Sequence, residues 1–89
     1  MSSIIVRHRV ADFDKWKAAY DEHGPTRREY GLTDVSLLRD TDDPNAVTIL
    51  FGASDPARTQ AFVSSDDLRE VMTRAGVVSK PDVWFATEV

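Results

Sequence analysis

Hydrophobic and polar residues alternate along four segments of the chain, and each alternation predicts a β-strand. The segments are residues 4–10, 33–39, 46–52 and 83–87. A period of two with β-branched residues is typical of a strand with one buried face. Residues 40–45, Asp-Thr-Asp-Asp-Pro-Asn, form a dense turn signal. The second and third strands are therefore expected to pair as an antiparallel hairpin.

An aromatic stripe at helical spacing follows the first strand. Asp12 can cap this helix, and Gly24-Pro25 interrupts it, because glycine is a poor helix former and proline supplies no N–H. A short helical turn is expected to resume over residues 27–30, with Gly31 at its exit. The stripe of the first helix consists of Phe13, Trp16, Tyr20 and His23.

A second helical region follows the hairpin. Asp55 can act as a cap with Pro56 at the first helical position, and this helix is expected to end near Val63. Ser65 can cap a further helix, which Gly76 ends. The apolar stripe of this further helix has the i, i+3, i+4, i+7 spacing and consists of Leu68, Val71, Met72 and Ala75.

Residues 1–89 are therefore expected to form a single α+β domain. The order strand, helix, strand, strand, helix, strand is ferredoxin-like, with a four-stranded antiparallel sheet and both helical regions on one of its faces. Alternate residues of a strand point to opposite faces, so parity sorts the strand residues into two sets. The face expected to meet the helices contains Ile4, Val6, His8, Val10, Val35, Leu37, Val47, Ile49, Phe51, Val83 and Phe85. The outer face contains Ile5, Arg7, Arg9, Ser36, Leu38, Thr48, Leu50, Trp84 and Ala86.

The outer face is partly apolar. Ile5, Leu38, Leu50 and Trp84 together make more apolar surface than a monomer usually leaves exposed. A homodimer in which sheet packs on sheet is therefore expected. The alternative is that these are scattered exposed apolar residues, which monomers tolerate.

Composition excludes several classes of partner. The net charge of −4 argues against non-specific binding of nucleic acid, which needs clustered Lys and Arg. The absence of cysteine excludes disulfides and thiolate metal sites. No apolar run approaches the ~20 residues that span a bilayer, and no signal peptide precedes the first strand. We therefore expect a cytoplasmic protein without a membrane or nucleic-acid partner.

His8 is the sharpest candidate for chemistry. It lies in mid-strand on a face otherwise made of Ile and Val, so it is expected to point between the sheet and the helices. An imidazole there titrates near neutrality and can act as general acid or base on a bound phenol or enol. The alternative is a core histidine that is hydrogen-bonded to a helix or a tyrosine.

His23 is the second catalytic candidate, as a polar group at the mouth of the same space. The alternative is a histidine near a helix C-terminus, where positive charge is favourable. His8 and His23 have no paired carboxylate nearby in sequence, and a zinc set or facial triad needs a third ligand. We therefore expect neither a metal nor another cofactor.

Several large side chains are expected to line a pocket for a compact aromatic ligand near His8. Arg27 and Arg28 could hold a carboxylate or phenolate at its edge, although such a pair is more often a solvated helix face. The aromatic residues have a simpler alternative as plain core. The expected substrate-binding residues are Trp16, Tyr20, Arg27, Tyr30, Phe51, Phe62, Met72 and Phe85.

Several stretches together resemble a known family. They are residues 4–10 (Ile-Ile-Val-Arg-His-Arg-Val), 11–16 (Ala-Asp-Phe-Asp-Lys-Trp), 43–45, 64–68 and 75–77, with His23 placed before Arg27 and Gly31. With this element order, the chain resembles the antibiotic biosynthesis monooxygenase-like and cyclase-like proteins of the dimeric α/β-barrel superfamily. The resemblance implies a cofactor-independent enzyme that acts on a compact aromatic or polyketide-like molecule by proton transfer.

In this interpretation His8 is the acid or base, Tyr20 and His23 orient the substrate, and Trp16 forms a wall. The alternative is a non-catalytic dimeric protein that binds a small ligand or serves as an accessory protein. Family monooxygenases use an asparagine and a tryptophan around an aromatic substrate, whereas the single asparagine here, Asn45, lies in the predicted turn. The Asn, Trp and His set of the haem-degrading members is not found either, so the resemblance does not extend to haem degradation.

Overall fold

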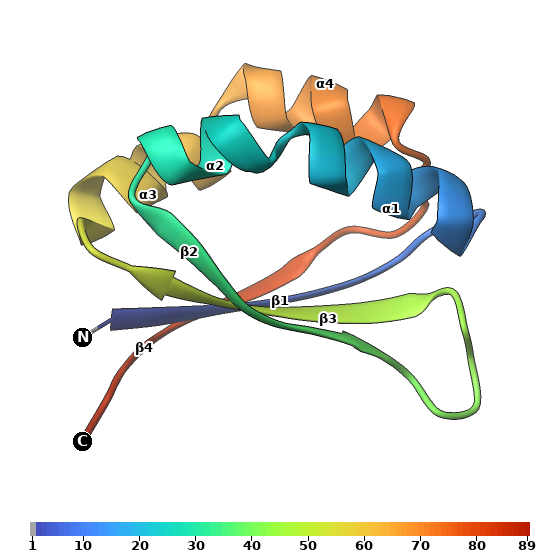
Figure 1. Ribbon diagram of the computed structural model, residues 1–89, viewed down its shortest axis with the longest axis horizontal. Coiled ribbons are helices and arrows are strands. Elements are labelled where there is room, and N and C mark those ends of the chain that lie inside the picture. Colours follow the sequence, from blue (N-terminus) through green and yellow to red (C-terminus); the bar gives the residue numbers. More distant parts are fainter. Residues whose placement is uncertain (1) are drawn as a thin grey trace.

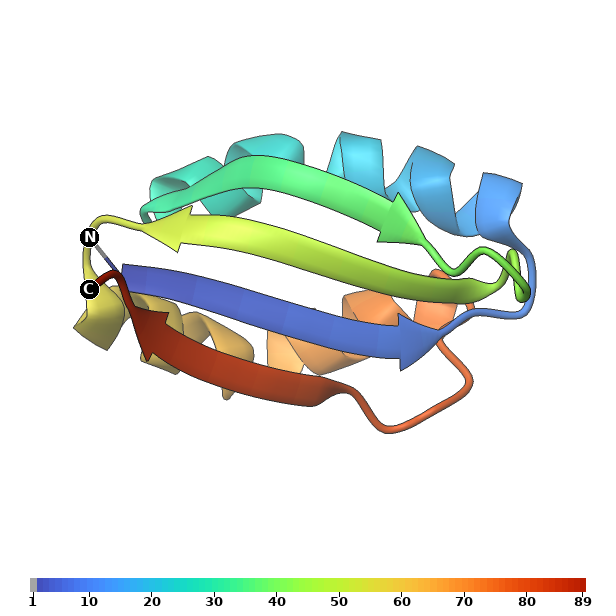
Figure 2. The ribbon, with the colours of Figure 1, turned by 90° about the horizontal axis from the view of Figure 1, so that it is seen from below.

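The computed structural model describes residues 2–89 and has the predicted ferredoxin-like order. Strands β1 (Ser2–Arg9), β2 (Leu32–Arg39), β3 (Ala46–Ala53) and β4 (Asp82–Thr87) form one sheet in the order β2-β3-β1-β4. Every neighbouring pair of strands is antiparallel. The helices cover one face of the sheet (Figure 1), and the view from below shows the strands in front of them (Figure 2).

Each helical region consists of two helices. Helices α1 (Phe13–Glu22) and α2 (Gly24–Glu29) connect β1 to β2, and α3 (Pro56–Val63) and α4 (Asp66–Arg74) connect β3 to β4. Helix α2 begins at Gly24, earlier than the predicted turn over residues 27–30, because proline is tolerated in the first turn of a helix. No helix of the described residues is long and apolar enough to cross a membrane.

The predicted caps fix where three helices begin. The side chain of Asp12 accepts a hydrogen bond from the backbone N–H of Lys15 at the start of α1. The Asp55 side chain accepts from two backbone N–H groups at the start of α3, and Ser65 accepts from one at the start of α4. These bonds satisfy donors that a helix N-terminus leaves free, so local sequence determines these boundaries.

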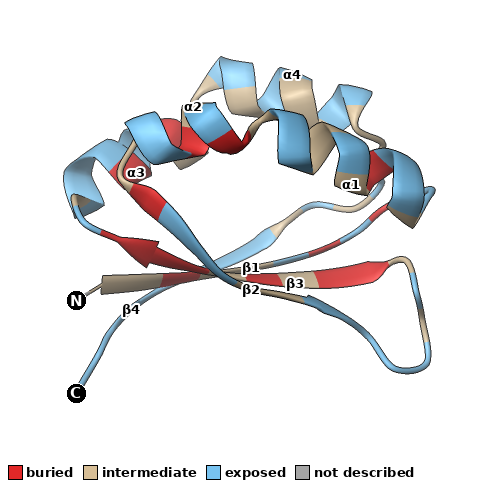
Figure 3. Cartoon of the chain, in the orientation of Figure 1, coloured by how far each residue is buried: buried red, intermediate tan, exposed pale blue. Residues whose placement is uncertain are grey.

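The core lies between the helices and the two central strands. Ile4 on β1 is opposite Phe51 on β3, and Val6 is opposite Ile49 in the same register. Buried positions concentrate along β3 and on the helices that face it (Figure 3). Strand β3 is covered almost throughout because it has neighbouring strands on both edges and helices above it.

Strand β2 departs from strict alternation. Asp34 is opposite Phe51 and Ser36 is opposite Leu50, so one extra residue, Val35, is inserted between them. Asp34 consequently shares the helix-side face with Phe51, and Val35 is 58% exposed. The prediction that Val35 meets the helices is wrong, because a β-bulge reverses the parity of everything before it.

The edge strand β4 is exposed along its whole length. Its register places Val83 opposite Val6 and Phe85 opposite Ile4, on the predicted face. The helices do not cover this edge, however, and Phe85 is half exposed. The expectation that Val83 and Phe85 are covered by the helices is therefore wrong, because parity gives a residue's face and not whether that face is covered.

Candidate active site

A cavity of about 90 Å³ lies between the helices and the helix-side face of the sheet. Strands β1 and β3 form its floor, and α1, α3 and α4 supply most of its walls. The lining is mostly apolar, with two imidazoles, one guanidinium and one phenol among it. The lining residues are Val6, His8, Trp16, Ala19, Tyr20, His23, Arg27, Ile49, Phe51, Phe62, Leu68, Val71, Met72 and Ala75.

His8 is the buried titratable group on the floor of this cavity. It is 5% exposed, lies opposite Val47, and meets the Trp16 ring edge-on with 5.6 Å between ring centroids. Its Nδ1 atom is buried and has no hydrogen-bond partner among the described residues. Buried polar atoms are rarely left without a partner, so this geometry does not match the alternative of a hydrogen-bonded core histidine.

Burial also determines the charge of His8. Desolvation lowers the pKa of this imidazole, and a weaker interaction with its own backbone opposes the shift. A lowered pKa means that the neutral ring predominates near neutral pH. His8 is therefore in the form that accepts a proton.

A stack of side chains forms one wall of the cavity. The Trp16 and Tyr20 rings are stacked with 5.0 Å between centroids. The guanidinium carbon of Arg27 lies 3.7 Å from the centre of the Tyr20 ring, on its face. Offset aromatic and cation–π contacts both favour this arrangement, so the wall is held rigid beside His8.

Arg27 is held by three hydrogen bonds. Its Nε and Nη2 atoms donate to the two carboxylate oxygens of Asp34 at 3.2 and 3.1 Å, and Nη1 donates to the Tyr20 carbonyl at 2.7 Å. The side chain of Arg27 is 6% exposed, whereas that of Asp34 is 43% exposed. Arg27 is thus not on a solvated helix face, although Arg28 is.

The same cluster sets the state of Tyr20. Burial raises the pKa of its hydroxyl to about 12, the Asp34 carboxylate adds to the shift, and Arg27 opposes it. Tyr20 therefore remains protonated over the ordinary pH range and can donate a hydrogen bond. It is not a base near neutral pH.

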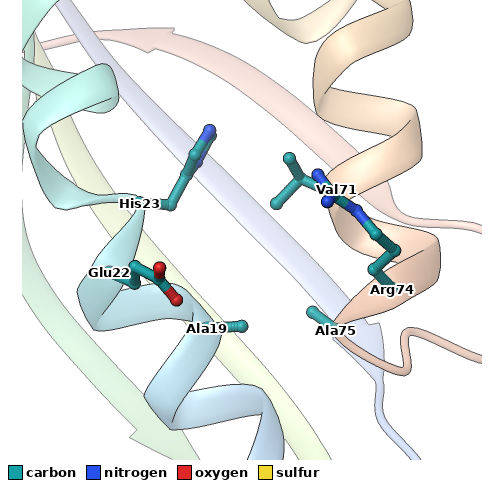
Figure 4. A pocket seen from close by; sticks show the side chains of 6 residues that line it. All are labelled: Ala19, Glu22, His23, Val71, Arg74 and Ala75. Carbon is teal, nitrogen blue, oxygen red and sulfur yellow. The ribbon is translucent and has the colours of Figure 1, made fainter.

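A second hollow, a groove of about 380 Å³, lies between α1 and α4 (Figure 4). It shares Ala19, His23, Val71 and Ala75 with the inner cavity, so the groove and the cavity are adjoining spaces. His23 lies where the two spaces meet, which is the position expected for it. Glu22 and Arg74 complete the lining of the groove.

His23 packs flat against a ring of α3. Its centroid is 5.8 Å from that of Phe62, and Tyr30 stacks on Phe62 at 4.7 Å. Burial lowers the pKa of His23, and the positive charges of Arg27 and Arg74 lower it further. His23 is therefore also neutral near neutral pH.

The structure places eight of the ten predicted site residues around the inner cavity. They are His8, Trp16, Tyr20, His23, Arg27, Phe51, Phe62 and Met72. Tyr30 and Phe85 are not part of its lining. Tyr30 stacks on Phe62, and Phe85 lies at a separate surface depression beside Pro56 and Gln60.

Sequence reasoning missed three charged residues around the site, which are Glu22, Asp34 and Arg74. Asp34 reaches the helix-side face only because of the β-bulge, and no residue pattern in β2 indicates it. Arg74 is in the last turn of α4, where its position next to the predicted stripe residues Val71 and Ala75 was a usable signal. No group of three His, Cys, Asp or Glu side chains that could hold a metal ion is present among residues 2–89.

The fold is that of the antibiotic biosynthesis monooxygenase-like domains, and solved structures match it over the whole chain. An antibiotic biosynthesis monooxygenase superposes with a TM-score of 0.71 and 17% identity, covering 100% of this chain and 99% of that chain. A protein assigned to the same group, from Bordetella bronchiseptica, has a TM-score of 0.78 and 18% identity, covering 99% and 96%.

SnoaB, a cofactor-independent oxygenase from Streptomyces nogalater, has a TM-score of 0.72 and 15% identity, and the match covers 99% of this chain and 94% of SnoaB. No protein-family model and no curated protein matches the sequence. At these identities the likeness shows the fold, and the resemblance expected from the sequence is confirmed at that level.

Proposed function

We propose that this protein is a small cofactor-independent enzyme that binds a compact aromatic molecule and catalyses proton transfer through His8. The observation that carries the proposal is the buried, unpartnered Nδ1 of His8 at a cavity walled by Trp16 and Tyr20. The fold likeness to SnoaB, itself a cofactor-independent oxygenase, supports the general class of chemistry.

The proton transfer proceeds without creating net charge in the cavity. Neutral His8 takes a proton from an acidic C–H or O–H of the ligand, whose electron pair remains on the ligand as an enolate or phenolate. The imidazolium and the anion then form an ion pair inside the low-dielectric site. Return of the proton to a different atom completes an isomerisation or permits a cyclisation.

We assign Arg27 the role of stabilising the anion. A guanidinium has five N–H donors, and three of those of Arg27 are used by Asp34 and the Tyr20 carbonyl. We assign the two remaining Arg27 donors to an oxygen that becomes negative. Such preorganised donors commonly supply the largest stabilisation of developing charge.

Volume favours a single-ring substrate. The inner cavity of about 90 Å³ is smaller than the roughly 150 Å³ that accommodates benzene in an apolar protein cavity. A single ring fits once a flexible side chain such as Met72 moves aside and enlarges the cavity. A fused polyketide ring system does not fit unless α1 and α4 separate, so we favour the compact aromatic class.

Hydrogen–deuterium exchange tests the chemistry even while the product is unidentified. Phenols and enolisable aryl ketones are incubated with the protein in D₂O, and exchange at their acidic C–H positions is followed by NMR. We expect the wild type to accelerate exchange and the His8→Gln variant to lose about 100-fold or more of that rate. The matched control is Tyr30→Phe, which lies outside the cavity lining. Ligand binding with equal exchange in wild type and His8→Gln refutes the catalytic role and supports the non-catalytic alternative.

We also propose that the enzyme is a homodimer that pairs the outer sheet faces. Leu50, Ile5 and Trp84 lie directly opposite one another across β3, β1 and β4 and form one apolar row. Leu38 and Val35 on β2 add two more exposed apolar side chains near this row. A domain of this size buries a modest share of its surface alone, so covering this face adds stability.

Sedimentation velocity at micromolar concentration tests the dimer. We expect a dimer for the wild type and a monomer for Ile5→Lys, because the lysine charge is placed at the centre of the apolar row. The matched control is Val78→Lys, an exposed apolar position outside the sheet. A monomeric wild type overturns the proposal.

A further inference from the structure

The groove between α1 and α4 has one wall from each helix end (Figure 4). Ala19, Glu22 and His23 come from the end of α1, and Val71, Arg74 and Ala75 come from the end of α4. The two alanines leave room beside His23, where the groove meets the inner cavity. A ligand can therefore have its ring in the inner cavity and its side chain in the groove.

Arg74 is an available cation in this groove. Its side chain is exposed and makes no ion pair with any described residue, whereas Arg69 on the same helix faces Asp66 at 3.9 Å. Arg27 lines the adjoining inner cavity, and the positive charges of Arg27 and Arg74 both lower the pKa of His23. Because Asp34 neutralises Arg27, Arg74 is the cation at this mouth that has no ion-pair partner among the described residues, and its charge can attract an anion.

Glu22 is the opposing charge at the rim. It lines the same groove from the α1 side and makes no ion pair with any residue that the structure describes. A bound anion must therefore lie toward Arg74 and His23, away from the Glu22 carboxylate. The groove therefore has a positively charged side at Arg74 and a negatively charged side at Glu22, unlike a purely apolar groove.

We infer that this groove is an anion-binding subsite in which Arg74 and His23 take the carboxylate of an arylalkanoic acid whose ring occupies the inner cavity. The inference rests on the proposed function, because it names the substrate class for that site. The reacting part of the ligand lies at His8 and its acidic tail at Arg74, so the subsite fixes which atom meets the base. A guanidinium suits a carboxylate because it donates two parallel hydrogen bonds.

Arg74 also has a purely structural explanation. A cation in the last turn of α4 interacts favourably with the helix dipole. That role predicts a small loss of stability on substitution and no change in ligand preference. A matched pair of ligands separates the two explanations.

Calorimetric titration with 3-phenylpropionate and 3-phenylpropanamide provides this comparison, because the two probes differ only in the charged group. We expect the acid to bind about tenfold more tightly than the amide, the effect of one charge-assisted contact. Arg74→Gln abolishes the preference for the acid, and Glu22→Gln increases it, while neither changes binding of the amide. Arg69→Gln is the matched control and leaves both affinities unchanged.

Three results overturn the subsite. They are equal binding of acid and amide, no binding of either, and an equal loss of acid binding in Arg74→Gln and Arg69→Gln. If exchange depends on His8 but the two probes bind equally, the proposed function stands and the subsite does not. If the preference for the acid depends on Arg74 but no exchange is catalysed, the subsite stands and the protein binds its ligand without catalysis.

Discussion

Replacing Asp34 with asparagine tests the cluster that holds the wall of the cavity. The substitution keeps the size of the side chain and one acceptor oxygen, but it removes the charge that neutralises Arg27. Arg27 is 6% exposed, so its charge cannot be transferred to water by a small rearrangement. The remaining contacts of Arg27, to the Tyr20 carbonyl and ring, do not supply a countercharge.

The magnitude follows from the burial of the two partners. Breaking a fully buried ion pair by removing one partner costs about 3–5 kcal/mol, and an exposed pair about 0–1 kcal/mol. Asp34 is 43% exposed, which places this pair between the two limits. We therefore expect Asp34→Asn to lower the free energy of unfolding by roughly 1.5–2.5 kcal/mol.

Urea unfolding measures this change, with Asp21→Asn as the control. Asp21 pairs with Lys17 one turn away on the exposed side of α1, so its loss is expected to cost about 0.3–0.5 kcal/mol. A second readout is the tyrosinate titration in a Tyr30→Phe background, in which the pKa of Tyr20 falls from about 12 because Asp34 helps to raise it. Equal destabilisation by the two substitutions, at an unchanged m-value, would show that the reasoning is wrong.

Three further predictions concern the histidines and two glycines. Burial lowers the pKa of His8 and of His23, so the unfolded chain binds more protons in acid, and stability is lost as the pH falls below about 6.5. His8→Gln should show a shallower loss in urea unfolding between about pH 7 and pH 5; an identical slope would contradict this. His8→Leu should raise the urea midpoint of the ligand-free protein, since it removes an unpartnered buried polar atom; a lowered midpoint would count against that reasoning. Gly31→Ala should destabilise more than Gly76→Ala: both have positive φ, +80° and +87°, but a Cβ at Gly31 would lie 2.7 Å from the Ser54 hydroxyl oxygen. Thermal unfolding checks the order of the two variants, and the reverse order would refute it.

The fold could be predicted from the sequence because its signals are local. Period-two alternation, the caps at Asp12, Asp55 and Ser65, and the turn over residues 40–45 each act over a few residues. Their order then leaves few topologies for a chain of this length. The strands begin within two residues of their predicted positions, with β1 starting at Ser2 rather than residue 4.

The site could be predicted only where it follows from that local pattern. His8 and Trp16 reach the cavity because strand parity and helical spacing direct them there. Asp34 could not be assigned, because the bulge at Val35 changes the register through contacts with β3 that are distant in sequence. The exposure of Phe85 was also not predictable, because it depends on how far the helices extend over an edge strand.

The unpartnered nitrogen of His8 bears on the choice between an enzyme and a filled core. Leaving a buried polar atom without a partner costs about 1–3 kcal/mol, a large fraction of the stability of a small domain. A leucine at this position would fill the same space without that penalty. The helices also offer polar partners nearby, since Tyr20 and Arg27 line the same cavity, yet their hydrogen bonds and ion pairs are made with each other and with Asp34. A neutral imidazole with an unpartnered nitrogen at a cavity gains a partner when a ligand binds there, which is why we place the chemistry at His8.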